Sequence, residues 1–301
     1  MTKYQRNLSG RIGERWDKIV DGVSYLYRQA ASFIMVFFHD TKEMTQQPKP
    51  LSANTLSPIV AGAIGGSGTR VLTQILCMCG IDMGCSLDSK TWDSLPLREY
   101  LATEFSKLAI GCMKHEPDLS LPTISRLRTA IQKHRGSAEA DTRWGWKNPR
   151  SMWLIPFFAH CFPDMFFILL VRDGRDIALS RNKFLLRSSG KQLLWDASYP
   201  SEELFQLALW EKGNRCAIQN GQSMLGERFI IVRYEDLCSQ PLQTIDRLLA
   251  SLKINHSSCS TKQLLKIIEP SRSIGRGEIL TREKVIPEST MELLRDLGYT
   301  T

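Results

Sequence analysis

The chain has 301 residues, of which 43% are hydrophobic and 23% are charged, so it can bury a sizeable core in one principal domain. The formal net charge of +8 suits an anionic ligand, an acidic acceptor or an anionic membrane surface. We expect no nucleic-acid partner, because the chain contains no recognisable nucleic-acid-binding module. The eight cysteines include no C-x-x-C pair, which favours free thiols in a reducing compartment over a zinc or disulfide framework.

The first fifty residues differ in character from the rest of the chain. Several basic residues precede the apolar run Ala30–Phe38, which is much shorter than the roughly 20 residues that a membrane-spanning helix needs. We expect residues 1–50 to form a helical tail with a linker, and residues 51–301 to form the main domain. A packing or interfacial helix is the preferred interpretation of the tail, and a signal or membrane anchor is the alternative. The expected location is cytoplasmic, with residues 20–40 as a candidate for peripheral membrane contact.

Apolar runs and helix-like stretches alternate through the main domain. The predicted strands are Pro58–Ile64, Met165–Val171, Arg228–Arg233 and a short one within Arg143–Lys147. The predicted helices are Val71–Gly80, Ile177–Leu186, Ser201–Leu225 and Pro241–Leu252. This alternation predicts an α/β fold of three layers around a central parallel sheet.

A glycine-rich loop follows the first predicted strand and leads into a predicted helix. Its residues are Gly65, Gly66, Ser67, Gly68, Thr69 and Arg70. Backbone N–H groups at a helix N-terminus can converge on an anion, and glycines let the backbone approach phosphate oxygens closely. The hydroxyls and the arginine offer further donors. A simple connecting turn is the alternative. No Walker A pattern fits this stretch, because no lysine follows the last glycine.

A second candidate anion site follows the strand Met165–Val171. Arg172 stands at its carboxyl end, where open α/β sheets bind ligands, and Ser180 lies eight residues further on. We expect Ser180 about two helical turns into the next helix. An arginine fork and a hydroxyl can together hold a phosphate. A strand-end arginine paired with a nearby aspartate is the alternative.

The two segments together resemble the sulfotransferases that use 3′-phosphoadenosine 5′-phosphosulfate (PAPS), of the bacterial or carbohydrate type. The loop Gly65–Arg70 resembles the family's 5′-phosphosulfate loop, with Gly66 where that loop has a basic residue and with a cation at Arg70 instead. Arg172 and Ser180 match the 3′-phosphate segment of the family, including the interval between them. The resemblance runs from about Pro58 to Tyr299.

Two further segments extend the resemblance. Lys147 lies in a Trp-Gly-Trp-Lys-Asn-Pro-Arg stretch, and residues 270–277 resemble a late basic loop that closes over the nucleotide. The resemblance therefore implies nucleotide contacts from Arg272, Gly275 and Arg276. The stretch Arg233–Leu237 fits a Tyr-Glu-Asp segment of the family, for which we expect a structural role.

The resemblance implies in-line transfer of a sulfuryl group from PAPS to a hydroxyl or amine of a carbohydrate, lipid or small metabolite. Such catalysis depends on positioning and on cations that neutralise developing charge, so no metal is expected. Lys147 and Arg70 are the candidate cations. A P-loop kinase or nucleotide triphosphatase, or a nucleotide-binding protein without turnover, remains an alternative.

The catalytic base is harder to assign from the sequence. The cytosolic branch of the family has a histidine two residues after the lysine, but this chain has Pro149 there. Another branch uses an acidic residue beyond the phosphate-loop helix, a region that contains Asp88 and Asp93. His115 is a third candidate. We predict Asp88 as the base.

Overall fold

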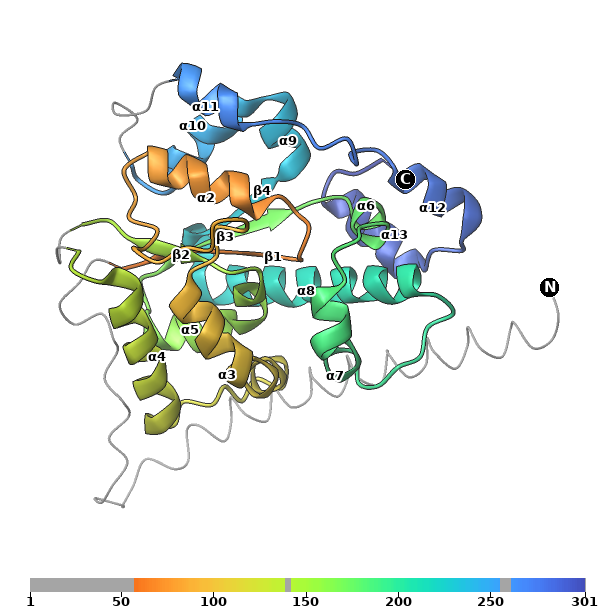
Figure 1. Cartoon of the computed structure of the whole chain (residues 1–301). Coiled ribbons are helices and arrows are strands. Elements are labelled where there is room, and N and C mark those ends of the chain that lie inside the picture. Colours follow the sequence, from red (N-terminus) through yellow and green to blue (C-terminus); the bar gives the residue numbers. More distant parts are fainter. Residues whose placement is uncertain (1–56, 139–141, 255–260, 301) are drawn as a thin grey trace. The chain divides into compact units, whose positions relative to one another are not determined.

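The computed structural model describes residues 57–138, 142–254 and 261–300 (Figure 1). The predicted tail over residues 1–50 and its candidate membrane contact over residues 20–40 lie outside these ranges. In the ranges that are described, no helix is both long and apolar enough to cross a membrane.

A parallel four-stranded sheet forms the centre of the main domain. In spatial order its strands are β2 (Gly145–Lys147), β1 (Ile59–Ala63), β3 (Phe166–Val171) and β4 (Phe229–Arg233). Each predicted strand is present to within two residues at either end. The predicted α/β fold is confirmed.

Both faces of the sheet are buried, which explains why the strands read as continuous apolar runs. Successive residues of β3 point to opposite faces: Phe167 and Leu169 enter one hydrophobic cluster, and Phe166, Ile168 and Leu170 enter another. Helices cover each face, which completes the three predicted layers (Figure 1).

The helices divide between these layers. One face carries α2 (Thr69–Met78), α9 (Tyr234–Ser239), α10 (Pro241–Ser251) and α11 (Thr261–Ile267). The other face carries α3 (Leu95–Met113), α4 (Leu121–Arg135), the 3₁₀ helix η1 (Pro149–Leu154), α5 (Ile155–Cys161) and α8 (Glu202–Leu225). The remaining elements are α6 (Gly174–Ala178), the π-helical turn η2 (Leu186–Gly190), α7 (Lys191–Leu193), η3 (Gly226–Arg228), α12 (Gly277–Glu283) and α13 (Glu288–Asp296).

The helix predicted over Ile177–Leu186 is wrong. Helix α6 ends at Ala178, and Ser180 therefore lies in the turn after it rather than inside a helix. The Lys183 ammonium accounts for part of this ending, since Nζ donates to the Ala178 carbonyl at 2.7 Å and satisfies a terminal acceptor of the helix.

The parallel arrangement brings the ends of all four strands to one edge. The glycine-rich loop follows β1, and Lys147 ends β2. Arg172 directly follows β3, and Tyr234 directly follows β4. Residues that are far apart in sequence therefore meet at the carboxyl edge of the sheet, where α/β proteins bind their ligands.

Candidate active site

The glycine-rich loop has the geometry of an anion cradle. Gly66 and Gly68 have φ values of 99° and 88°, in the left-handed region that favours glycine. The Ser67 hydroxyl donates to the Ile64 carbonyl at 2.7 Å, which tightens the turn. Helix α2 then begins at Thr69, and no side chain of the described residues caps it. Its first N–H groups are therefore left for an anion, with the helix dipole oriented toward it.

Tyr234 forms a wall beside this loop. A Cβ atom added at Gly68 would lie 2.3 Å from the Tyr234 ring, so only glycine fits this position. The guanidinium carbon of Arg172 lies 4.9 Å from the centroid of the same ring. The sequence indicated a structural role for this tyrosine, whereas the structure places its ring between the loop and the strand-end arginine.

Arg172 is buried and has one unsatisfied donor. Its Nη1 donates to the Gly66 carbonyl at 3.3 Å, and its Nη2 donates to Ser273 at 2.8 Å and to Asp176 at 3.4 Å. Its Nε is buried without a hydrogen-bond partner among the described residues. A buried N–H group without a partner is unusual and fits an anion that binds there. The Ser180 hydroxyl lies nearby, 3.2 Å from the point that a Cβ on Gly66 would occupy.

The late basic loop docks against the same segment. The Asp176 carboxylate accepts the backbone N–H of Gly275 at 3.0 Å and that of Gly277 at 2.7 Å. The side chains of Arg272 and Arg276 are exposed. Ser273 and Asp176 thus hold the loop against Arg172, and both arginines of the loop remain at the surface.

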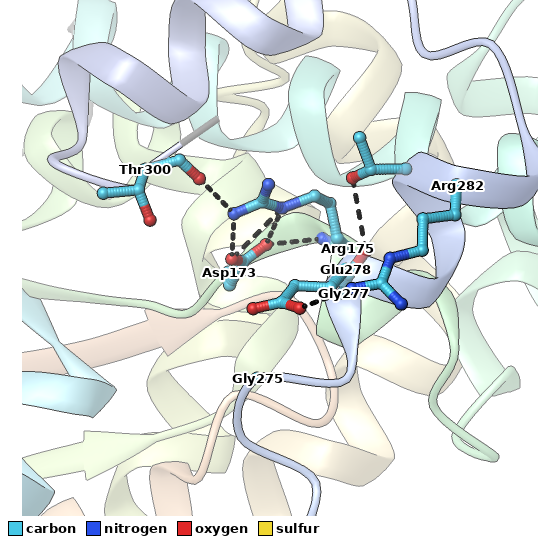
Figure 2. A pocket seen from close by; sticks show the side chains of 8 residues that line it. Asp173, Arg175, Gly275, Gly277, Glu278, Arg282 and Thr300 are labelled. Atoms are coloured by element: carbon cyan, nitrogen blue, oxygen red, sulfur yellow. Dashed lines mark hydrogen bonds and ion pairs between the residues drawn. The ribbon is translucent and has the colours of Figure 1, made fainter.

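A cavity of about 370 Å³ lies beside this loop (Figure 2). Its charged side chains are paired with one another: Arg175 with Asp173 at 2.7 Å, and Arg282 with Glu278 at 3.4 Å. Arg175 also donates to the Thr300 carbonyl at 2.7 Å, which ties the end of the described chain to α6. Because these charges neutralise each other, the cavity is a weaker anion site than the glycine-rich loop.

Lys147 points into the site from the end of β2. Its side chain is only 1% exposed, and its Nζ donates to Asp93 Oδ1 and to the Thr91 carbonyl, both at 2.5 Å. Burial lowers the pKa of Lys147, and the charge of Asp93 opposes that shift. Trp92, between the two acceptors, has a φ of 60°, which is uncommon for a bulky residue and turns both of its neighbours toward one ammonium.

Asp88 is occupied by its own turn. Its Oδ1 accepts the backbone N–H groups of Lys90 and Thr91 at 2.9 and 2.8 Å, and its Oδ2 accepts Arg98 at 2.8 Å. These contacts hold the pKa of Asp88 well below its usual range, and the two backbone N–H groups make the largest contribution. A carboxylate so strongly stabilised in its charged form is a poor proton acceptor. The geometry thus disfavours our prediction of Asp88 as the base.

Of the other predicted residues, one lies far from Asp93 and one lies at the loop. His115 follows the 19-residue helix α3, so the helix length of about 28 Å separates it from Asp93, which lies just before the other end. Arg70 is exposed at the start of α2, and its charge contributes to the lowered pKa of Lys147. Asn182, which the sequence did not indicate, lies 3.2 Å from the Cβ position of Gly65.

This combination defines a class: α/β proteins with a P-loop-like anion cradle at the carboxyl edge of a parallel sheet. The family model described as "Sulfotransferase family" matches residues 58–258, which is well over half of the chain. The chain therefore belongs to the sulfotransferase family. No curated protein matches it.

Solved structures of sulfotransferases align with this chain at low identity. The sulfotransferase domain from the olefin synthase of Synechococcus PCC 7002 is 15% identical, with 86% of this chain and 100% of that domain covered and a TM-score of 0.50. The sulfotransferase domain from the curacin biosynthetic pathway is 14% identical, with 82% and 99% covered and a TM-score of 0.48. A mouse sulfotransferase complexed with PAP is 13% identical, with 81% and 84% covered and a TM-score of 0.39.

Proposed function

We propose that this protein transfers the sulfuryl group of PAPS to a hydroxyl or amine of a carbohydrate, lipid or small-metabolite acceptor. The observation that carries the proposal is the convergence of two anion-binding elements, the loop Gly65–Arg70 and the buried Arg172, at one edge of the sheet. The Arg172 guanidinium bonds to the loop itself, so the two elements form one continuous surface. PAPS carries anionic groups at both its 5′ and 3′ positions.

The 5′-phosphosulfate is assigned to the N-terminus of α2 and the loop before it. The loop N–H groups and the Thr69 hydroxyl hold the phosphate, Ser67 braces the loop through its bond to the Ile64 carbonyl, and Arg70 faces the sulfate. The 3′-phosphate is assigned to Arg172 Nε and the Ser180 hydroxyl. Gly275 and the arginines Arg272 and Arg276 close over the nucleotide from the late loop.

Lys147 and Asp93 perform the transfer step. One proton of the Lys147 ammonium remains after its bonds to Thr91 and Asp93, and it donates to the oxygen that bridges phosphate and sulfate. An S–O or S–N bond to the acceptor forms as the bridging S–O bond breaks, and the acceptor's proton passes to Asp93. We assign the base to Asp93 rather than Asp88, because among the described residues the Asp93 carboxylate accepts only from Lys147, through Oδ1, whereas both oxygens of Asp88 are held by its turn and by Arg98. A cytoplasmic location suits the seven free cysteines of the described chain.

Labelled PAPS tests this proposal. The protein is incubated with PAPS carrying radioactive sulfur and with an extract of the native host. Mass spectrometry identifies the labelled products. Release of the desulfated nucleotide, 3′-phosphoadenosine 5′-phosphate (PAP), is quantified in the same samples. We expect PAP to form in proportion to sulfated product, and Lys147→Met to lower the rate of both by about 10²–10³. Hydrolysis of ATP without consumption of PAPS would overturn the proposal.

A further inference from the structure

An arginine held between two phenylalanine rings lies beside the transfer residues. Arg150 follows Lys147 by three residues, in η1. Its guanidinium carbon is 4.9 Å from the centroid of the Phe105 ring and 4.8 Å from that of the Phe184 ring. Its Nη1 donates to the Leu101 carbonyl at 3.0 Å. The rings and this bond together fix the plane of the guanidinium.

Phe184 connects this arginine to the donor loop. The chain passes from Ser180 and Asn182, which lie against the loop glycines, directly to Phe184. The Phe184 side chain is 64% exposed although it covers the guanidinium. The segment 180–184 thus spans the short distance from the donor site to Arg150.

The guanidinium retains unused hydrogen-bond donors. Among the described residues, the Leu101 carbonyl is the only hydrogen-bond acceptor of the Arg150 side chain, so most of its five N–H groups remain available. Burial lowers the pKa of Arg150, and the nearby charge of Asp93 opposes that shift. Arg150 lies three residues after Lys147 and is covered by Phe184, which is two residues from Asn182 beside the loop, so it borders the transfer site.

We propose that Arg150, clamped by Phe105 and Phe184, binds an anionic group on the acceptor, close to the hydroxyl or amine that receives the sulfuryl group. The planar fork of a guanidinium matches the two oxygens of a carboxylate or of a phosphate or sulfate ester. The acceptor class is therefore an anionic alcohol, phenol or amine rather than a neutral one. This inference rests on the proposed function, because it assumes that the neighbouring loop holds the sulfate donor.

Two probes of the same shape but different charge test the clamp. Calorimetry on protein saturated with PAP compares para-hydroxybenzoate with para-hydroxybenzamide. A charge-assisted hydrogen bond contributes about 1.5–3 kcal/mol, so we expect the carboxylate to bind roughly 10- to 100-fold more tightly. Arg150→Gln should remove this preference, and Arg150→Lys should keep only part of it because it retains the charge but not the fork.

Matched variants separate binding from structural support. Arg126→Gln removes a surface arginine that is paired with Glu104 and should keep the full preference. Phe184→Leu removes only an exposed ring and should reduce the preference for the carboxylate probe several-fold. This variant tests the clamp if Arg150→Gln does not fold. Equal affinity for the two probes, binding of neither, or a preference that survives in the folded clamp variants would overturn the inference. Failure of the wild type to bind PAP would instead refute the proposed donor.

Discussion

Removal of the Lys147 charge should separate catalysis from stability. In Lys147→Met the bridging oxygen loses its charge-assisted donor, and loss of such a contact costs about 10²–10³ in kcat. The same change leaves the Asp93 carboxylate without its partner at a position where its side chain is only 14% exposed. Breaking one side of a buried pair costs about 3–5 kcal/mol, and the residual exposure of Asp93 places the loss near the lower value.

The expected shift in melting temperature follows from this loss. About 3 kcal/mol corresponds to a decrease of roughly 6–12 °C in Tm for a domain of this size. The double variant Lys147→Met with Asp93→Asn removes both charges together, so most of the lost stability should return. Its turnover should nevertheless be no higher than that of the single variant, because the donor to the bridging oxygen and the proposed base are then both missing.

The assay combines calorimetric unfolding with release of PAP from PAPS at saturating acceptor. A single Lys147→Met variant that keeps turnover within tenfold of wild type would refute the catalytic role. Recovery of turnover in the double variant would also refute the account, because that variant lacks both the proposed donor and the proposed base.

Further variants test the base, the loop and the pH dependence of stability. Asp93→Asn should lower kcat by about 10²–10⁴, as expected for loss of a general base, whereas Asp88→Asn should leave kcat within a few-fold; steady-state kinetics that reverse this order would contradict the assignment. Gly80→Ala adds a methyl group that meets nothing within 4 Å and should cost about 1–2 kcal/mol for its left-handed backbone alone. Gly68→Ala adds one 2.3 Å from the neighbouring tyrosine ring, so denaturant unfolding should show about 1–3 kcal/mol more; equal losses would argue against the clash. Burial raises the pKa of Glu235 above its ordinary value, so the native state holds this proton more tightly than the unfolded state. The stability that this proton contributes is therefore lost as the pH rises from the unfolded-state pKa through the higher native-state pKa. Unfolding measured across pH should show a flatter profile in Glu235→Gln, and an unchanged slope would refute this origin.

The strands and the anion loop could be predicted from the sequence because their signals are local. A buried parallel strand needs a short apolar run, as in Met165–Val171, and the glycines of the loop mark positive φ directly. The helices α3 and α4 were not predicted. Each begins with a Ser-Leu-Pro sequence, at Ser94 and Ser120, which combines an N-cap residue with proline in the first turn and is the signal that could have found them.

The proposed base could not be predicted from the sequence, because the choice between Asp88 and Asp93 depends on contacts that exist only in the folded chain. Asp88 and Asp93 are equivalent candidates by spacing. Only the hydrogen bonds of the turn show that Asp88 holds its own backbone, while the αL conformation of Trp92 directs Asp93 to Lys147. The clamp on Arg150 was equally hidden, since its two rings come from segments about 80 residues apart in sequence.

The donor assignment is tested most directly by calorimetry that compares PAP with adenosine 5′-monophosphate and ATP. PAP and the monophosphate differ only in the 3′-phosphate, which we assign to Arg172 and Ser180. Because hydrogen bonds to charged groups contribute about 1.5–3 kcal/mol each, PAP should bind at least about tenfold more tightly, and Arg172→Gln should remove most of that difference. Equal affinity for PAP and the monophosphate, or tighter binding of ATP, would contradict the account.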